Sequence, residues 1–334
     1  MTRKSPAPAR DAAISGGRRA PPRGDHVGFE RAIARSLAAL EAQKRTPTPV
    51  QRAMFEALRT AGSLVVTAPT GSGKTAAVML PLLADLDERL SLDPARVAGV
   101  RVLYLAPVRA LADGHCVRLR ELAEALGASI KVDVRTGDST SAHRAKIRRA
   151  PPDVLVTTPE TLAVMLGTEA RDALAHAECV VLDELHLLAA GKRGALLSTT
   201  LETLNALTRA RGNAAPRRIA MSATARPIEA LAAWVSPDAR VVAVTEGALT
   251  PTLDLADPTM DDAYPSAGWT WRAALPAVAR TIATNEGATL VFVGARGRAE
   301  QWTLALRDVL PARVAVACFH GSLSAEERGA VAAG

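Results

Sequence analysis

A glycine-rich loop at residues 68–75 carries the clearest chemistry in the sequence, and it reads Ala-Pro-Thr-Gly-Ser-Gly-Lys-Thr. It follows the apolar run 64–67 directly and opens a helical stretch. Backbone N–H groups in such a loop close around phosphate oxygens, and the helix N-terminus adds positive potential. Lys74 can reach the β- and γ-phosphates, and the Thr75 hydroxyl can hold Mg²⁺. The loop predicts a nucleotide-phosphate site rather than a plain turn, made of Thr70, Gly71, Ser72, Gly73, Lys74 and Thr75.

Two carboxylates at the end of a later apolar run complete this chemistry. Residues 180–186 read Val-Val-Leu-Asp-Glu-Leu-His. Asp183 can bind Mg²⁺ directly or through its water shell, and Glu184 can orient and deprotonate an attacking water. An ordinary acidic strand end is the alternative. We predict a catalytic set of Lys74, Asp183 and Glu184, with Thr75 and Asp183 as the residues that hold the metal ion.

Six short apolar runs alternate with amphipathic stretches and must position these groups. Most runs are almost continuous in Val, Ile and Leu, as in strands of a parallel sheet that are buried on both faces. The run 130–134 differs, because Lys131 and Asp133 alternate with its apolar residues and predict one wet face. The alternation of strands and helices predicts a doubly wound α/β fold. We expect strands at 64–67, 100–105, 130–134, 154–157, 180–182 and 219–221, and helices at 74–89, 109–126 and 196–209.

The pattern divides the chain of 334 residues into four parts. Residues 1–25 hold a net charge of +4 out of the total of +7 and too few apolar residues to fold, which predicts a disordered basic tail. This tail is either an arm that attracts nucleic acid or a solvated extension. Residues 26–245 form the first lobe, 246–268 a connection rich in Pro and Asp, and 269–334 the start of a second lobe. In the second lobe we expect helices at 269–285 and 298–309, strands at 289–293 and 314–317, and a last helix from Ser324.

The composition excludes several classes of protein. Hydrophobic residues make up 48% of the chain, which is enough for a core and excludes wholesale disorder. No apolar run reaches the roughly 18 residues of a membrane-spanning helix. Cys116, Cys179 and Cys318 lie far apart, which excludes a CxxC metal site and predicts a reducing, cytoplasmic location. Aromatic residues are only 3% of the chain, so contact with nucleic-acid phosphates is favoured over base stacking.

The phosphate loop and the carboxylates together resemble motifs of superfamily 2 nucleic-acid helicases, and other segments follow in the order of that superfamily. Residues 47–51 resemble the adenine-reading motif, which implies that Gln51 contacts adenine, and residues 222–224 resemble the motif that couples hydrolysis to movement between lobes. Three turns resemble the motifs that hold the nucleic-acid backbone, namely 106–112, 135–138 and 157–161. The resemblance implies nucleic-acid contacts from Arg109, Thr136, Gly137, Thr158 and Gly321, and coupling roles for His186, Ser222 and Thr224.

A more specific resemblance is to the large helicase-related (Lhr) group of DExH helicases, over about residues 45–334. The segments that carry it are 135–138, 151–155, 181–194, 289–293 and 320–324. It implies a RecA-like lobe with a parallel sheet, which binds ATP and Mg²⁺, followed by an incomplete second RecA-like lobe. It further implies ATP-driven movement on DNA and a role in DNA repair.

The sequence departs from the group in two places. Gly294 stands where the group often has Asn, and the motifs expected after the Ser324 helix, including one that supplies arginine fingers, do not follow. Since an arginine finger is worth roughly 10³–10⁵ in rate, we expect slow turnover and no unwinding by this chain alone, which leaves room for a partner chain that completes the second lobe. Two alternatives stay open, an RNA helicase and an ATP-gated nucleic-acid binding module without motor activity.

Overall fold

The computed structural model describes residues 26–60, 62–93, 97–223, 227–246, 271–324, 327, 330 and 331. The chain separates into two compact units, Met1–Leu249 and Thr250–Gly334. The division falls inside the connection expected at 246–268. The predicted basic tail, nearly all of that connection and the coupling residue Thr224 lie outside the described residues.

A seven-stranded parallel sheet forms the centre of the first unit, with the strand order β3-β4-β2-β5-β6-β1-β7. This confirms the predicted α/β fold with a parallel sheet. The six expected strands are present with shifts of up to two residues at their ends, and β7 was not predicted. The strands are β1 Leu64–Thr67, β2 Val102–Leu105, β3 Val132–Arg135, β4 Val154–Thr157, β5 Cys179–Leu182, β6 Arg217–Ser222 and β7 Arg240–Ala243.

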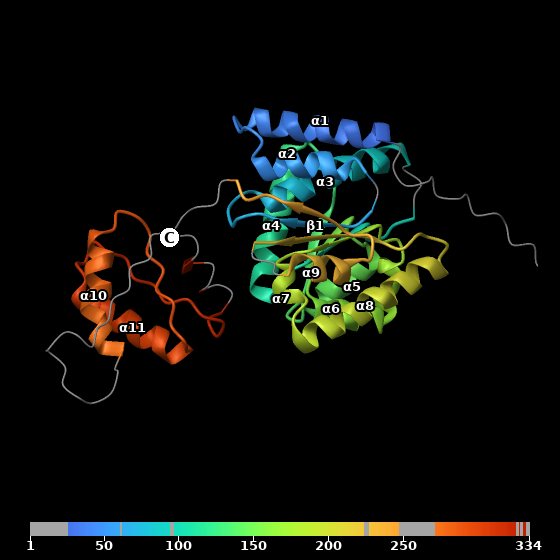
Figure 1. Cartoon of the computed structure of the whole chain (residues 1–334). Helices are drawn as coiled ribbons and strands as arrows, with labels where there is room; N and C mark the ends of the chain where they lie inside the picture. The colour runs from blue at the N-terminus through green and yellow to red at the C-terminus, as the bar shows by residue number, and fades with distance from the viewer. Residues whose placement is uncertain are drawn as a thin grey trace, which may run out of the picture. The chain divides into compact units, whose positions relative to one another are not determined.

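Helices cover both faces of the sheet (Figure 1). One core cluster joins the first four helices to one set of strand side chains, among them Val66 and Val181. A second cluster joins the later helices to the alternate set, among them Val65 and Leu182. The first set of helices is α1 His26–Ala42, α2 Pro49–Leu58, α3 Lys74–Leu92 and α4 Arg109–Ala125. The second set is α5 Ser141–Arg149, α6 Pro159–Leu166, α7 Leu185–Leu188, α8 Gly191–Ala210 and α9 Ile228–Val235, with the 3₁₀ turn Glu169–Leu174.

Burial along the strands follows their place in the sheet. The inner strands β2, β4 and β5 are buried at every position, as their continuous apolar runs predict. The edge strand β3 leaves Asp133 and Val134 partly exposed, because it has a neighbour on one side only. The other edge strand, β7, is mostly exposed.

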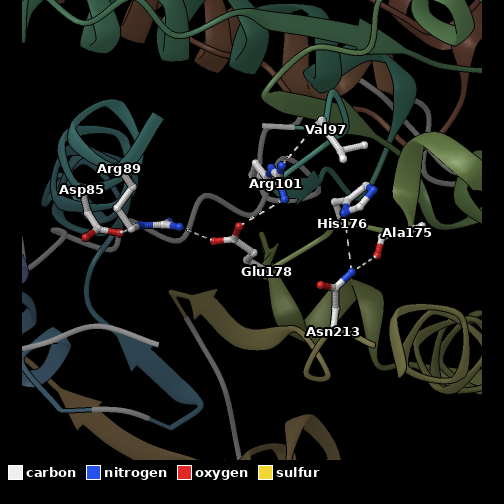
Figure 2. Close-up of polar contacts among 8 residues, drawn as sticks. All are labelled: Asp85, Arg89, Val97, Arg101, Ala175, His176, Glu178 and Asn213. Atoms are coloured by element: carbon white, nitrogen blue, oxygen red, sulfur yellow. Dashed lines mark hydrogen bonds and ion pairs between the residues drawn. The ribbon is translucent and has the colours of Figure 1, made fainter. Parts of the chain in front are cut away.

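A network of charged residues ties the elements together at the amino ends of the strands (Figure 2). Glu178, just before β5, accepts hydrogen bonds from Arg89 of α3 at 2.6 Å and from Arg101, just before β2, at 3.5 Å. Arg89 also donates to Asp85 at 2.9 Å, and Arg101 donates to the carbonyl oxygen of Val97 at 2.8 Å. These contacts fix the end of α3 against the start of two central strands, at the edge of the sheet opposite to the predicted phosphate loop.

The second unit contains two helices that pack together, α10 Trp271–Thr284 and α11 Arg296–Val309. The rings of Trp271 and Trp302 lie 5.3 Å apart between them. Both helices were predicted. Glu327 is helical. The Ser324 N–H donates to the Glu327 carboxylate, and the Glu327 N–H donates to the Ser324 hydroxyl. This pair of hydrogen bonds is a capping box at the start of the expected last helix.

The prediction of strands at 289–293 and 314–317 was wrong. Both segments lie outside regular secondary structure, and Leu290 and Phe292 are 79% and 89% exposed. A strand exists only through the hydrogen-bonded ladder with a neighbour. Neither segment has such a ladder among the described residues, so an apolar pattern alone did not suffice here.

Candidate nucleotide and nucleic-acid site

The parallel topology gathers the predicted site residues of the first unit at one edge of the sheet. The phosphate loop follows β1, Arg109 follows β2, Thr158 follows β4 and Asp183 follows β5, while Ser222 ends β6. Because all strands are parallel, their carboxyl ends meet at the same edge. This is where α/β sheets bind their ligands.

The phosphate loop has the backbone that its glycines allow. Gly71 and Gly73 have positive φ angles of 74° and 90°. A Cβ at Gly73 would lie 3.3 Å from Nε2 of Gln51, so the loop also needs the missing side chain there. The ammonium of Lys74 donates to the carbonyl oxygens of Ala68 at 2.8 Å and Pro69 at 2.9 Å. The loop is therefore closed around its own lysine.

Lys74 is nine-tenths buried, and this burial lowers the pKa of its ammonium, while the charges of Glu184 and Asp183 oppose that shift. The two carboxylates therefore lie close enough to act on the lysine electrostatically. The structure thus places the three predicted catalytic side chains, which follow two different strands, at one edge of the sheet and within electrostatic range of one another.

The segment that resembles the adenine-reading motif is attached to the phosphate loop. Thr48 and Gln51 form a capping box at the start of α2, in which the Thr48 N–H donates to Gln51 Oε1 at 2.9 Å. The Thr48 hydroxyl donates to the carbonyl oxygen of Ser72 at 2.9 Å. A cavity of about 110 Å³ opens beside this contact, and its lining includes Thr48, Gln51, Gly71, Ser72, Gly73 and Leu122.

The carboxylate of Asp183 is buried and held from three sides. The Tyr104 hydroxyl donates to Oδ2 at 2.8 Å, His115 Nε2 lies 3.0 Å from the same oxygen, and the Glu184 N–H donates to Oδ1 at 3.0 Å. Burial would raise the pKa of Asp183, but the hydrogen bond and charge of His115 and the hydrogen bond from Tyr104 hold that pKa below its usual value. Asp183 is therefore kept ionised in a buried position.

Glu184 has a strained backbone and an oxygen without a hydrogen-bond partner. Its φ of 47° lies in the left-handed region, which is unusual for a residue other than glycine. Its Oε2 is buried and accepts no hydrogen bond within the part of the chain that the structure describes. Such an oxygen is costly in isolation, and it is the group that a water molecule or ligand would satisfy.

His186 links this carboxylate to the end of β6. Its Nδ1 lies 2.9 Å from the Ser222 hydroxyl and 3.5 Å from Glu184 Oε2. The carbonyl oxygen of Ser222 also accepts from the N–H of Ala68, at the start of the phosphate loop. Of the three expected coupling residues, His186 therefore lies beside the carboxylate of Glu184, and Ser222 contacts the start of the phosphate loop.

Three of the expected nucleic-acid residues meet at the turn after β3. A Cβ at Gly137 would lie 2.7 Å from the guanidinium of Arg109, so that group packs directly on the glycine backbone. Arg109 also forms an ion pair with Asp138 at 2.8 Å. Thr136 is buried, and its N–H donates to the Ser139 hydroxyl at 3.0 Å, which shapes the turn.

The other two expected residues, Thr158 and Gly321, belong to other segments of the chain. Thr158 is 1% exposed, and its side chain caps α6 by accepting from the N–H of Thr161 at 3.4 Å. Its hydroxyl is therefore occupied, and the first turn of α6 rather than that hydroxyl is available to a phosphate. Gly321 belongs to the second unit, where the Leu323 N–H donates to the carbonyl oxygen of His320 at 3.2 Å.

Sequence reasoning missed Tyr104 and His115, the two side chains that hold Asp183. Tyr104 lies in the strand predicted at 100–105 and His115 in the helix predicted at 109–126, and neither was predicted to belong to the site. One signal was available: a tyrosine inside a fully buried run must find a partner for its hydroxyl. The identity of that partner depends on the pairing of β2 with β5, which a single sequence does not show.

The donor set fits Mg²⁺ held with a nucleotide. The described residues contain no group of three or more His, Cys, Asp or Glu side chains that could hold a metal ion. Mg²⁺ typically takes only one or two carboxylates and completes its shell with phosphate and water oxygens. Asp183 and the Thr75 hydroxyl, both near Tyr104, match that requirement.

Comparison with known proteins gives a family and several relatives. The model of the DEAD/DEAH box helicase family matches residues 48–231. The Lhr helicase/uracil glycosylase of Escherichia coli is 32% identical over 298 residues, which are 81% of this chain and 19% of that protein. The Mycolicibacterium smegmatis counterpart is 36% identical over 79% of this chain and 18% of that protein. This chain thus spans about a fifth of the length of these curated relatives.

Solved structures give the same answer for the fold. Mycobacterium smegmatis helicase Lhr bound to ssDNA and AMP-PNP superposes with a TM-score of 0.72 and 32% identity, over 91% of this chain and 40% of that one. The DUF1998 helicase MrfA bound to DNA superposes with a TM-score of 0.70 at 24% identity, over 89% of this chain and 42% of that one, which supports the fold alone. The RecA-like fold and the resemblance to Lhr helicases are confirmed.

Proposed function

The chain belongs to the DEAD/DEAH box helicase family, and we propose that its first unit binds ATP with Mg²⁺ and hydrolyses it to drive movement along DNA. The observation that carries this proposal is the meeting of Lys74, Asp183 and Glu184 at one edge of the sheet. The family match and the Lhr relatives support the same activity.

Nucleotide binding would start at the phosphate loop. Its backbone N–H groups and the ammonium of Lys74 take the phosphates, and Lys74 exchanges the carbonyl oxygens of Ala68 and Pro69 for phosphate oxygens. Gln51 then reads the adenine beside the cavity at the start of α2. Thr70, Gly71, Ser72, Gly73 and Thr75 complete the loop.

Hydrolysis would use the two carboxylates in different ways. Thr75 and Asp183 would hold Mg²⁺, which would offset the negative charge of the phosphates. Glu184 orients the attacking water with Oε2, which accepts no hydrogen bond from the described residues, and takes its proton. His186 and Ser222 pass the change at Glu184 to the end of β6, and Thr224 lies two residues further along the chain.

Nucleic acid would lie across the turns at the same edge of the sheet, where Arg109, Thr136, Gly137 and the first turn of α6 after Thr158 take backbone phosphates. Gly321 of the second unit is a separate proposed contact. DNA is favoured over RNA because the Lhr neighbour at 32% identity is a complex with ssDNA. A role in DNA repair and a cytoplasmic location belong to the same proposal; the free thiols of all three cysteines are consistent with a reducing compartment.

The choice between DNA and RNA is tested by ATP hydrolysis with single-stranded DNA, with RNA of the same sequence and without nucleic acid. The proposal predicts that DNA stimulates the wild-type rate and that RNA does so less. Stimulation by RNA alone would replace the DNA assignment with an RNA helicase. Arg109→Gln should reduce stimulation but leave the basal rate unchanged, because Arg109 contacts the turn after β3 and not the nucleotide loop.

A further inference from the structure

A cluster of arginines lies beside the turn that Arg109 contacts. Arg135 is the last residue of the edge strand β3, and α5 begins six positions later. Arg144 and Arg148 lie four residues apart on α5, so their side chains share one face of the helix. Arg144 donates to the carbonyl oxygen of Gly137 at 3.0 Å, which connects this face to the turn.

Arg135 is buried without the partner that a buried guanidinium normally has. It is 8% exposed, and its Nε is buried without a hydrogen bond in the described ranges. Burial lowers the pKa of Arg135, and the positive charges of Arg144 and Arg148 lower it further. The positive charges of Arg144 and Arg148 therefore act against that of Arg135 in the free protein.

Carboxylates do little to balance this charge. Among the residues that the structure describes, neither Arg135 nor Arg144 forms an ion pair, and Arg148 lies 3.8 Å from Glu169, which is 85% exposed. The neighbouring Lys146 differs, because it pairs with Asp133 at 3.7 Å. An arginine with a purely structural role would be expected to have a carboxylate partner of that kind.

We propose that Arg135, Arg144 and Arg148 bind backbone phosphates of a single nucleic-acid strand and extend its path from the turn after β3 along α5. This inference rests on the proposed function, because the turn itself is the adjoining contact. Guanidinium groups match phosphate oxygens in two-point hydrogen bonds. Arg144 and Arg148 can bind phosphates of the same nucleic-acid strand, and the buried Arg135 at the end of β3 adds positive potential.

The alternative is that the arginines only shape the turn. Arg144 does hold the Gly137 carbonyl, but a structural role would make the charge stabilising. The repulsion of Arg135 by Arg144 and Arg148 predicts the opposite for the free protein, where removing two of the charges should leave the melting temperature unchanged or raise it. This readout separates a binding role from a structural one.

The test uses Arg144→Gln/Arg148→Gln in the full chain, with Lys146→Gln as the matched control on the same helix. Binding of a labelled oligothymidylate is followed by fluorescence anisotropy over a series of salt concentrations. We expect the double variant to bind roughly three- to tenfold more weakly, and its salt slope to fall by about 0.7 for each phosphate that no longer meets an arginine. Lys146→Gln should bind like the wild type, and the melting temperature of the double variant should not fall.

Three results would overturn the proposal. The first is unchanged oligothymidylate binding and salt slope in the double variant. The second is an equal loss of affinity in Lys146→Gln, which would show a general charge effect. The third is a loss of affinity confined to a duplex of the same length, which would assign the cluster to a duplex. Arg109→Gln separates this from the proposed function, since failure of both sets of variants to weaken binding would reject the nucleic-acid path as a whole.

Discussion

At the scale of single residues, the buried carboxylate of Asp183 is positioned by side chains that never touch the nucleotide in our scheme. Tyr104 and His115 occupy one of its oxygens, and the Glu184 N–H occupies part of the other. Three of the roughly four lone-pair positions of the carboxylate are therefore taken. Only the remaining lone-pair position, on Oδ1, would be open to a metal ion. Tyr104 and His115 are therefore positioning residues.

The first prediction concerns Tyr104→Phe and His115→Gln. Loss of one hydrogen bond to a buried, charged carboxylate costs about 1.5–3 kcal/mol, so the affinity for a fluorescent ATP analogue in the presence of Mg²⁺ should fall about tenfold or more. Binding of the same analogue with the metal chelated should change little. Equal losses of affinity with and without Mg²⁺ would contradict a role in positioning the metal ligand.

The second prediction concerns the backbone of the phosphate loop. Gly73→Ala places a Cβ at a φ of 90° and 3.3 Å from Gln51, whereas Gly127→Ala has a φ of 61° with nothing within 4 Å. Both substitutions should lower the free energy of unfolding by about 1–2 kcal/mol, because both force alanine into a left-handed conformation. Only Gly73→Ala should abolish ATP binding.

Urea unfolding and equilibrium nucleotide binding measure the two effects separately. Gly127→Ala is the matched control for backbone strain, since it lies after α4 and away from the loop. If Gly73→Ala bound ATP normally, the close approach of the loop to Gln51 would have no part in nucleotide binding.

At the scale of elements, position in the sheet decides which predictions succeed. The strands β2, β4 and β5 are buried on both faces and were readable from their apolar runs. The four-residue β7 has a short apolar run but was not predicted, and at the edge of the sheet it is exposed at most positions. The segments 289–293 and 314–317 have the apolar pattern but no ladder in the described region, and there the same rule failed.

The candidate site shows the same limit. Lys74, Asp183 and Glu184 were predictable because local motifs encode the loop and the strand end. Tyr104 and His115 were not predictable. The contact of Tyr104 with Asp183, for example, joins residues 79 positions apart and depends on which strands are neighbours. Pairing of β2 with β5 is a property of the whole sheet, and one sequence without relatives does not reveal it.

The third prediction concerns His176, which lies beside the network at the amino ends of the strands, with its Nδ1 3.5 Å from Nδ2 of Asn213 (Figure 2). Burial lowers the pKa of His176 below its ordinary value of 6.5, and the charges of Arg101 and Arg211 add to this. The unfolded chain therefore takes up the proton first as pH falls. The contribution of His176 to stability should be constant at higher pH and should decline as pH falls below the unfolded value.

Urea unfolding of the wild type and His176→Gln at about pH 8 and about pH 5.5 measures this difference across the range in which histidine titrates. The wild type should lose more stability than the variant between the two conditions. An equal loss of stability in both proteins would mean that His176 has the same pKa in the folded and unfolded states.

At the scale of the whole molecule, charge and chemistry reside in different places. More than half of the net charge of +7 belongs to residues 1–25, whereas the nucleotide site, the turn after β3 and the arginines of α5 all belong to the described part of the first unit. The overall charge is therefore a weaker argument for nucleic-acid binding than the placement of individual arginines. Within residues 26–60, 62–93, 97–223, 227–246 and 271–324, no helix is long and apolar enough to cross a membrane.

The central claim is that this unit hydrolyses ATP with Glu184 as the base, and it is tested most directly by Glu184→Gln. Binding of an ATP analogue should persist, because Lys74 and the loop remain intact, while single-turnover hydrolysis should fall by about 10²–10⁴, the usual contribution of a general base. Lys74→Ala should lose binding itself. If Glu184→Gln and the wild type bound ATP equally well and hydrolysed it equally slowly, the chain would be an ATP-gated binding module and the account of its chemistry would be wrong.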